Sequence, residues 1–185
     1  PDDNLRAKLE EALGKEVGNP MTDLELAGLS ALDAAGSNIS DLAGLEYCTN
    51  LTELWVYDNQ ISDISPLSKL TNLTKLYLWH NRNITDLTSL SSLTNLTDLG
   101  LYNNRIRDIT ALASLTKLTH LNLAYNKVVD ISSLSRLTKL VRLDLVKNSI
   151  VDLSPLVNNS GISGSIDIST KSENNPLNNL AYSSH

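Results

Sequence analysis

Apolar residues recur along the chain with a period of 22 residues. The repeated pattern is LxxLxLxxNxIxDIxxLxxLTN, which begins imperfectly at Leu29 and is clear from Leu51 onward. Further copies start at Leu73, Leu96, Leu118 and Leu140. A fixed period of this length indicates a solenoid, in which each unit buries its apolar face against the neighbouring units.

The LxL segment of each unit alternates apolar and variable residues, as expected for a short strand with one buried face. Stacked units would place these strands side by side in a parallel sheet. The remainder of each unit would return on the opposite side through a short 3-10 or helical turn. The predicted fold is an α/β repeat solenoid: a leucine-rich-repeat horseshoe with a parallel concave sheet, a convex side of short turns and a helical N-terminal cap.

Two polar positions recur within the repeat. An asparagine ends each predicted strand, at Asn59, Asn81, Asn104, Asn126 and Asn148. Its amide can both donate and accept, so it can pair backbone groups of neighbouring units and form a ladder. An aspartate follows the next Ile or Val at a fixed spacing, at Asp41, Asp63, Asp86, Asp108, Asp130 and Asp152. Capping of the convex turn explains all six aspartates, so we predict no metal site.

A solenoid needs its two ends closed. Residues 1–28 are predicted to form a helical N-terminal cap, with one amphipathic helix over residues 4–13 that stops at Gly14. A second short helix follows, because Thr22 and Glu25 have the spacing of a capping box.

The remaining chain divides into about six repeats over 29–156 and a degenerate capping unit with a tail over 157–185. Residues 166–168 are predicted to form a last strand, residues 175–177 a final turn, and residues 178–185 a frayed end.

Composition excludes several classes of protein. The net charge is −6, distributed as −9 over residues 1–72 and +3 over residues 73–185, which is too weak a basic character for nucleic-acid binding. No apolar run is long enough for membrane insertion. The single cysteine, Cys48, stands where the repeat has Leu, so we predict a buried thiol. We expect a monomer that needs no cofactor.

The pattern resembles the bacterial internalin-like leucine-rich-repeat proteins. The resemblance rests on the 22-residue unit, on the flanking segment NLRAKLEEALGK…MTDLELAGLSALDA and on the late NNPL. It implies a secreted or cell-surface module for adhesion or recognition, and it transfers no functional residue. Three features depart from the pattern. Ser37 replaces the first ladder asparagine, the Leu73 unit is one residue longer at Arg82 and Asn83, and the chain has no Phe.

Information about a partner must lie in the variable outward columns, which are the third, fifth, seventh and eighth positions of LxxLxLxx. These columns hold both tryptophans and four of the six tyrosines: Trp55, Tyr57, Tyr77, Trp79, Tyr102 and Tyr125. Each such ring can bury about 150–250 Å². They cluster in the central units and are missing from both ends, whereas simple β propensity would scatter them. We predict a partner-binding aromatic surface on the concave face.

Polar residues surround the predicted surface. The candidate partner-binding set also includes His80, Glu53, Asp58, Lys75, Arg105, Asn122 and Lys147. Further charges at Asp98, Lys127 and Arg142 complete a rim that would tune orientation and association rate more than affinity.

No catalytic constellation is visible, so we predict that the chain is not an enzyme. His80 and His120 fall in outward columns two units apart, without a fixed acid beside either, and His185 lies in the tail. No P-loop, GxGxxG or zinc spacing occurs. The favoured function is binding of a protein partner, such as a host or cell-surface protein. Two alternatives stay open: carbohydrate binding by exposed aromatics beside polar groups, and a cytoplasmic regulatory subunit.

Overall fold

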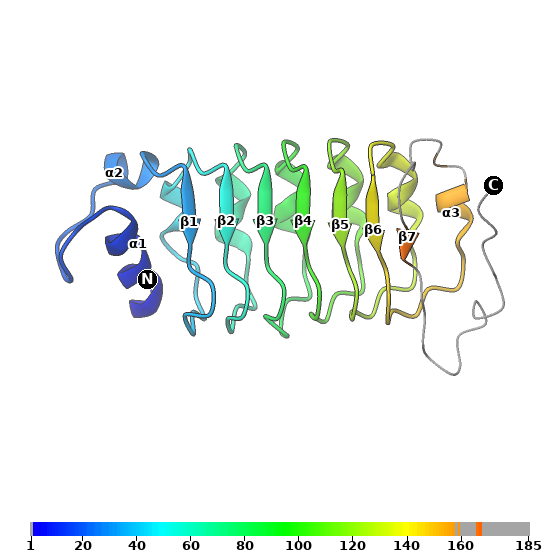
Figure 1. Cartoon of the computed structure of the whole chain (residues 1–185), viewed down its shortest axis with the longest axis horizontal. Helices are drawn as coiled ribbons and strands as arrows, with labels where there is room; N and C mark the ends of the chain where they lie inside the picture. The colour runs from blue at the N-terminus through cyan, green and yellow to red at the C-terminus, as the bar shows by residue number, and fades with distance from the viewer. Residues whose placement is uncertain (1, 158, 160–165, 168–185) are drawn as a thin grey trace.

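The computed structural model describes residues 2–157, 159 and 166–167. Seven short parallel strands form one sheet in sequence order, and they lie side by side in a single row (Figure 1). Their bounds are β1 Ala31–Asp33, β2 Glu53–Trp55, β3 Lys75–Tyr77, β4 Asp98–Gly100, β5 His120–Asn122, β6 Arg142–Asp144 and β7 Ile166–Asp167. The strand order confirms the predicted solenoid, because each unit pairs only with the units before and after it.

Short helices form the opposite, convex side of each unit. The 3-10 helices are η1 Leu45–Tyr47, η2 Ser65–Lys69, η3 Thr88–Ser92, η4 Thr110–Ser114 and η5 Ser132–Arg136, followed by the α-helix α3 Ser154–Val157. Between the two layers, the repeat leucines pack with almost no exposed surface. Leu54, Leu76 and Leu99, for example, lie in register on adjacent strands and are 0–2% exposed.

The N-terminal end carries the predicted helices. Helix α1 spans Asp3–Ala12, with the Asp2 carboxylate accepting two N–H groups of its first turn. Gly14 has φ +65°, a left-handed conformation in which the helix ends. Helix α2 spans Asp23–Ala27, and the Thr22–Glu25 capping box is present. Helix α1 packs against β1 and α2 against η1, so both helices lie at the first repeat (Figure 1).

Cys48 occupies a leucine position of the core and is 0% exposed, as predicted. Burial raises the pKa of its thiol to about 11.

The asparagine ladder is present and joins neighbouring repeats through buried backbone groups. Asn126 accepts from the Ile106 N–H at 3.0 Å and donates to the carbonyls of Leu101 and Leu123 at 2.9 Å. Asn59, Asn81 and Asn148 accept an equivalent N–H from the preceding repeat. In the first unit, the Ser37 hydroxyl donates to the Ala35 carbonyl within its own turn, while its backbone N–H donates to Asn59 Oδ1.

Asn104 is the exception in this ladder. Its Nδ2 donates to Leu78 and Leu101, but its buried Oδ1 has no hydrogen-bond partner. The preceding unit is the one with the extra residue at Arg82 and Asn83, and Arg82 has φ +61°. The insertion therefore coincides with a lost bond to the next repeat.

The recurring aspartates cap the turns into the convex side, as predicted. In the last five units, Oδ1 accepts the N–H two residues on, at 2.8 Å, and that residue begins the following short helix. Asp41 accepts from Ala43 in the same way, but η1 begins only at Leu45, so this cap precedes the helix. Among the described residues no cluster of metal-binding side chains occurs.

Three of these caps predict a dependence of stability on pH. Hydrogen bonds from the residue two positions on lower the pKa of Asp86, Asp108 and Asp152 below the ordinary 3.8. Their stabilisation is therefore complete above the unfolded pKa and is lost as pH falls through the lower folded values. Replacing all three by Asn, which still accepts through Oδ1, should flatten the fall in melting temperature below about pH 4. An equal fall in melting temperature for the two proteins between pH 7 and pH 2 would contradict this explanation.

Several predictions lie outside the described residues, namely Ile168 of the last strand, the turn at 175–177 and the frayed end at 178–185. The boundaries at 28 and 156 stay predictions. In the part of the chain that is described, no helix has the length and apolar character needed to cross a membrane.

Candidate functional site

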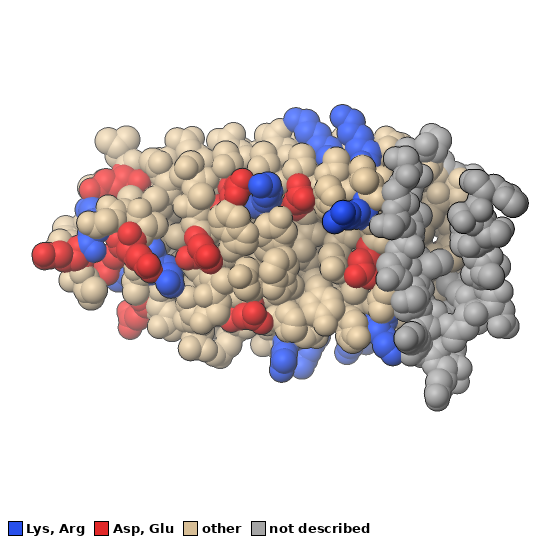
Figure 2. Space-filling view, in the orientation of Figure 1, with Lys and Arg blue, Asp and Glu red and all other residues tan. Residues whose placement is uncertain are grey.

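The outward side chains of the strands form one continuous surface, which we call the sheet face. Alternate strand residues point outward, so the third and fifth columns of consecutive units align through the strand register. The seventh and eighth columns follow directly after each strand. In the view of Figure 2, a row of acidic and basic side chains crosses the middle of the molecule above an uncharged area, and acidic side chains gather toward the N-terminal end.

Four aromatic rings on β2, β3 and the residues after them form the first ring group. Trp55 stacks on Tyr77 with centroids 6.3 Å apart, and Tyr57 stacks on Trp79 at 4.4 Å. Tyr77 and Trp79 contact each other at 4.9 Å, which joins the two stacks. The four predicted rings thus form one cluster across two repeats.

The second ring group continues along the same face. His80 lies 4.9 Å from Tyr102, and Tyr102 lies 5.1 Å from Tyr125. Among the described residues no ring contact joins the two groups, so the predicted surface consists of two adjacent clusters.

The aromatic rings cover part of one another's surface, so less of each ring is exposed to solvent than in an isolated surface side chain. Tyr125 keeps 46% of its surface exposed, whereas the other five predicted Trp and Tyr side chains are only partly exposed. Burial, followed by the nearby Asp98 carboxylate, raises the pKa of the Tyr77 phenol. The stacked rings therefore form a preorganised surface whose faces and edges remain accessible.

The eighth column has an unusual backbone. Asp58, His80, Asn103, Tyr125 and Lys147 all have φ between +53° and +58°. Gly36 has the same conformation in the first unit, at φ +59°. Asn, Asp and His tolerate this region comparatively well, whereas Tyr125 carries a steric cost of about 1–2 kcal/mol.

Several of the predicted charged residues have partners within the sheet face. Lys75 donates to Glu53 at 3.0 Å, and this hydrogen bond raises the pKa of the lysine. Asp58 lies 3.8 Å from His80 Nδ1. Arg105 is exposed at the edge of the sheet face, Asn122 lies on β5, and Lys147 follows β6. All thirteen predicted residues therefore lie on or at the edge of one face.

The expectation that neither outward histidine has an acid beside it is wrong. His120 Nδ1 lies 3.2 Å from Asp98 Oδ1, and His80 Nδ1 lies 3.8 Å from Asp58 Oδ1. In both pairs the acid occupies the same column one repeat earlier, so the parallel register brings the two side chains together. Comparison of adjacent units within each column could have found both pairs.

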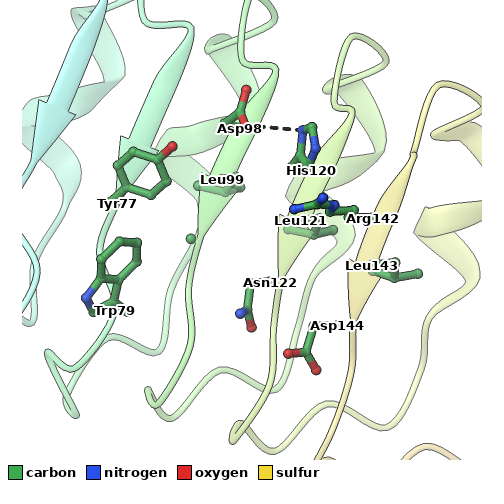
Figure 3. A pocket seen from close by; sticks show the side chains of 11 residues that line it. Tyr77, Trp79, Asp98, Leu99, His120, Leu121, Asn122, Arg142, Leu143 and Asp144 are labelled. Carbon is green, nitrogen blue, oxygen red and sulfur yellow. Dashed lines mark ion pairs between the residues drawn. The ribbon is translucent and has the colours of Figure 1, made fainter. Parts of the chain in front are cut away.

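A hollow of about 440 Å³ opens beside the first ring group, and Gly100 of β4 is one of the residues that line it (Figure 3). Tyr77 and Trp79 form its aromatic wall, while Asp98, His120, Asn122 and Arg142 line the other side. The fifth column lacks a side chain at Gly100, and the two rings lean into the space that a side chain would fill. A Cβ there would lie 2.7 Å from Trp79 Cε3 and 3.0 Å from Tyr77 Cδ1.

Gly100 and His120 are absent from the predicted partner-binding set, although both stood in the columns considered. Gly100 could have been noticed in the sequence, because it is a small residue between Tyr77 and Asn122 in a column of large side chains. The direction in which the neighbouring rings of Tyr77 and Trp79 lean could not be predicted from the sequence.

We predict that Gly100→Ala displaces the rings without unfolding the protein. Its backbone is an ordinary strand, so alanine is tolerated there, but the new methyl group collides with Trp79. Loss of ring contacts worth about 0.5–1.5 kcal/mol each should change the near-ultraviolet circular dichroism. Ala31→Gly alters one methyl group on β1 and serves as the control. An unchanged aromatic spectrum for Gly100→Ala would show that the rings do not depend on this glycine.

Comparison with known proteins supports the predicted family. The model for leucine-rich repeats (2 copies) matches residues 28–69, 71–114 and 116–158. No curated protein sequence matches the chain. Among solved structures, the internalin InlF from Listeria monocytogenes is 39% identical, with a TM-score of 0.84, over 91% of this chain and 52% of that one.

Two further solved structures from Listeria monocytogenes are similar. Internalin C2 is 32% identical, with a TM-score of 0.67, over 98% of this chain and 90% of that one. The functional domain of InlJ, which includes a cysteine ladder, is 28% identical, with a TM-score of 0.73, over 88% and 40%. The chain thus spans about half of the InlF structure and less of InlJ.

The repeat scaffold typically serves as a non-enzymatic module for protein–protein interaction. The repeats, the parallel sheet and the similarity to three internalins agree with one another. The chain belongs to the internalin-like leucine-rich-repeat proteins.

Proposed function

We propose that the chain binds a folded protein partner through the aromatic surface of the sheet face. The observation that carries this proposal is the pair of ring groups that runs across four consecutive repeats, on the side of the sheet away from the leucine core. Tyr and Trp dominate binding hot spots because they bury a large area and lose little side-chain entropy.

Ring stacking within one sheet could also serve stability alone. Two features favour binding. Among the described residues, no helix or strand packs onto the sheet face, so the rings cover no part of the core. Tyr125 occupies a left-handed position that Gly36 fills in the first unit, so its side chain is retained at a cost in backbone energy.

Within this proposal, the first ring group and Tyr102 supply most of the binding energy, and the surrounding residues supply orientation. Trp55, Tyr57, Tyr77, Trp79 and Tyr102 are the central contacts. The rim residues Glu53, Asp58, Lys75, Arg105 and Lys147, together with His80, Asn122 and Tyr125, would favour one orientation of the partner. Because the sheet is rigid, binding should require little movement of the backbone.

We further propose that this module acts as a monomer outside a bacterial cell, in keeping with its internalin relatives. Catalysis is not part of the proposal. Two hydroxyls lie beside the His120–Asp98 pair: that of Thr97 donates to Asp98 at 2.7 Å, and that of Thr119 donates to the Thr97 carbonyl at 3.0 Å. Both hydroxyls are therefore engaged within the protein instead of being aimed at a substrate.

The test is an affinity capture from host-cell surface extract and from culture fluid. The bait is compared with a variant in which Trp55, Tyr57, Tyr77 and Trp79 are all replaced by Ala. Tyr47→Ala serves as the matched control, because Tyr47 is 45% exposed in η1 on the convex side. Circular dichroism and melting confirm that all baits are folded.

We expect a protein partner that the parent and the Tyr47 control retain and the fourfold variant loses. Retention of the same proteins by all three baits would overturn the proposal and direct attention to the convex side and the ends.

A further inference from the structure

The hollow over Gly100 has a different character from the rest of the sheet face. The two ring groups are stacked aromatic surfaces, whereas the hollow combines an aromatic wall with a polar wall. Figure 3 shows the rings of Tyr77 and Trp79 nearly face-on, beside the open area above β4 and β5. A flat ligand could therefore lie against the rings and reach the polar side chains at the same time.

The polar side chains that line the hollow differ in whether they already have hydrogen-bond partners. Asp98 is fixed by the Thr97 hydroxyl at 2.7 Å and by His120 at 3.2 Å. Asn122 uses Oδ1 to accept the Ala124 N–H, which leaves its Nδ2 without a partner in the described structure. The exposed Arg142 guanidinium, on β6, likewise has no ion pair or hydrogen bond to a described residue.

This arrangement favours a ligand that accepts hydrogen bonds and is close to neutral. Asp98 and Asp144 line the hollow together with Arg142, so a highly charged ligand of either sign meets a group of its own sign there. The Asp98 carboxylate can still accept further hydrogen bonds beside the free Asn122 and Arg142 donors. Hydroxyl groups, which donate and accept at once, match such a mixed set.

We propose that this hollow binds a pyranose sugar, with the apolar face of the ring against Trp79 and Tyr77. The hydroxyl groups would accept from Asn122 Nδ2 and Arg142 and donate to the Asp98 carboxylate. The volume of about 440 Å³ lies within the range of small-ligand sites, and the open shape suits the end or branch of a longer saccharide. This inference goes beyond the proposed protein interaction and does not depend on it.

The test begins with the labelled chain on an array of neutral and uronate-containing glycans. The best free saccharide is then titrated at up to millimolar concentration, with tryptophan fluorescence and ligand-observed NMR as readouts. The first variant is Asn122→Asp, which keeps the Oδ1 acceptor for Ala124 and replaces the free donor by a negatively charged oxygen. The second is Arg142→Ala, and Tyr47→Ala on the convex side is the control.

We expect a neutral saccharide to bind, with its dissociation constant raised about fivefold or more in each of the two hollow variants and unchanged in the control. Binding only by uronates, binding of equal strength by all variants, or no binding at all would overturn the proposal. In the last case the hollow would serve a side chain of a protein partner instead. The capture experiment uses a different variant and readout, so either proposal can fail without the other.

Discussion

Asn126→Ala is expected to lower the free energy of unfolding by about 3 kcal/mol, because three buried backbone groups would each lose a partner worth about 1 kcal/mol or more. Those groups are the Ile106 N–H and the Leu101 and Leu123 carbonyls, which belong to two adjacent repeats. In a chain of 185 residues this corresponds to a fall of about 6–12 °C in melting temperature. Thermal and urea unfolding followed by circular dichroism would measure it.

Asn104→Ala is the matched comparison. Asn104 has the same place in the next repeat toward the N-terminus and the same two strong donor bonds, but its Oδ1 pairs with nothing. Its replacement should therefore cost about 1 kcal/mol less than that of Asn126. An equal or larger loss of unfolding free energy in Asn104→Ala would show that the unpaired Oδ1 does not weaken the contribution of Asn104 to stability.

The period of the sequence was sufficient to predict most of the fold. Every unit folds in the same way, so a column that is apolar in every unit must be buried. Cys48 is buried because it stands in such a column. The ladder asparagines and the capping aspartates were predictable for the same reason. Both are short side chains whose partners lie at fixed positions in the same or the neighbouring unit.

The departures from the repeat were harder to predict, since no second copy of the same feature constrains them. The extra residue at Arg82 and Asn83 was visible, but its effect appears in the following unit, at Asn104. The hollow over Gly100 depends on how Tyr77 and Trp79 orient after their strand, and that orientation is decided by packing instead of by spacing. Column position predicted which residues share the sheet face, but not which of them touch.

Trp79→Ala is expected to weaken binding of the captured protein partner by about 30-fold or more, which corresponds to about 2 kcal/mol. Trp79 stacks on Tyr57, contacts Tyr77 and borders the hollow, so it occupies the centre of the aromatic surface. Removing it also releases both neighbouring rings, which would then have to be ordered again on binding. Surface plasmon resonance or calorimetry with the purified partner gives the ratio of dissociation constants.

Stability separates this effect from a general loss of structure. Trp79 lies outside the leucine core, so its truncation removes ring contacts worth about 0.5–1.5 kcal/mol each and should lower the melting temperature far less than Asn126→Ala does. The two variants therefore have opposite signatures: Asn126→Ala weakens the scaffold and, while folded, leaves the surface in place, whereas Trp79→Ala leaves the scaffold and removes the centre of the surface. If Trp79→Ala reduces stability as much as Asn126→Ala but leaves partner affinity unchanged, the two ring groups are a structural feature of the sheet and the partner binds elsewhere.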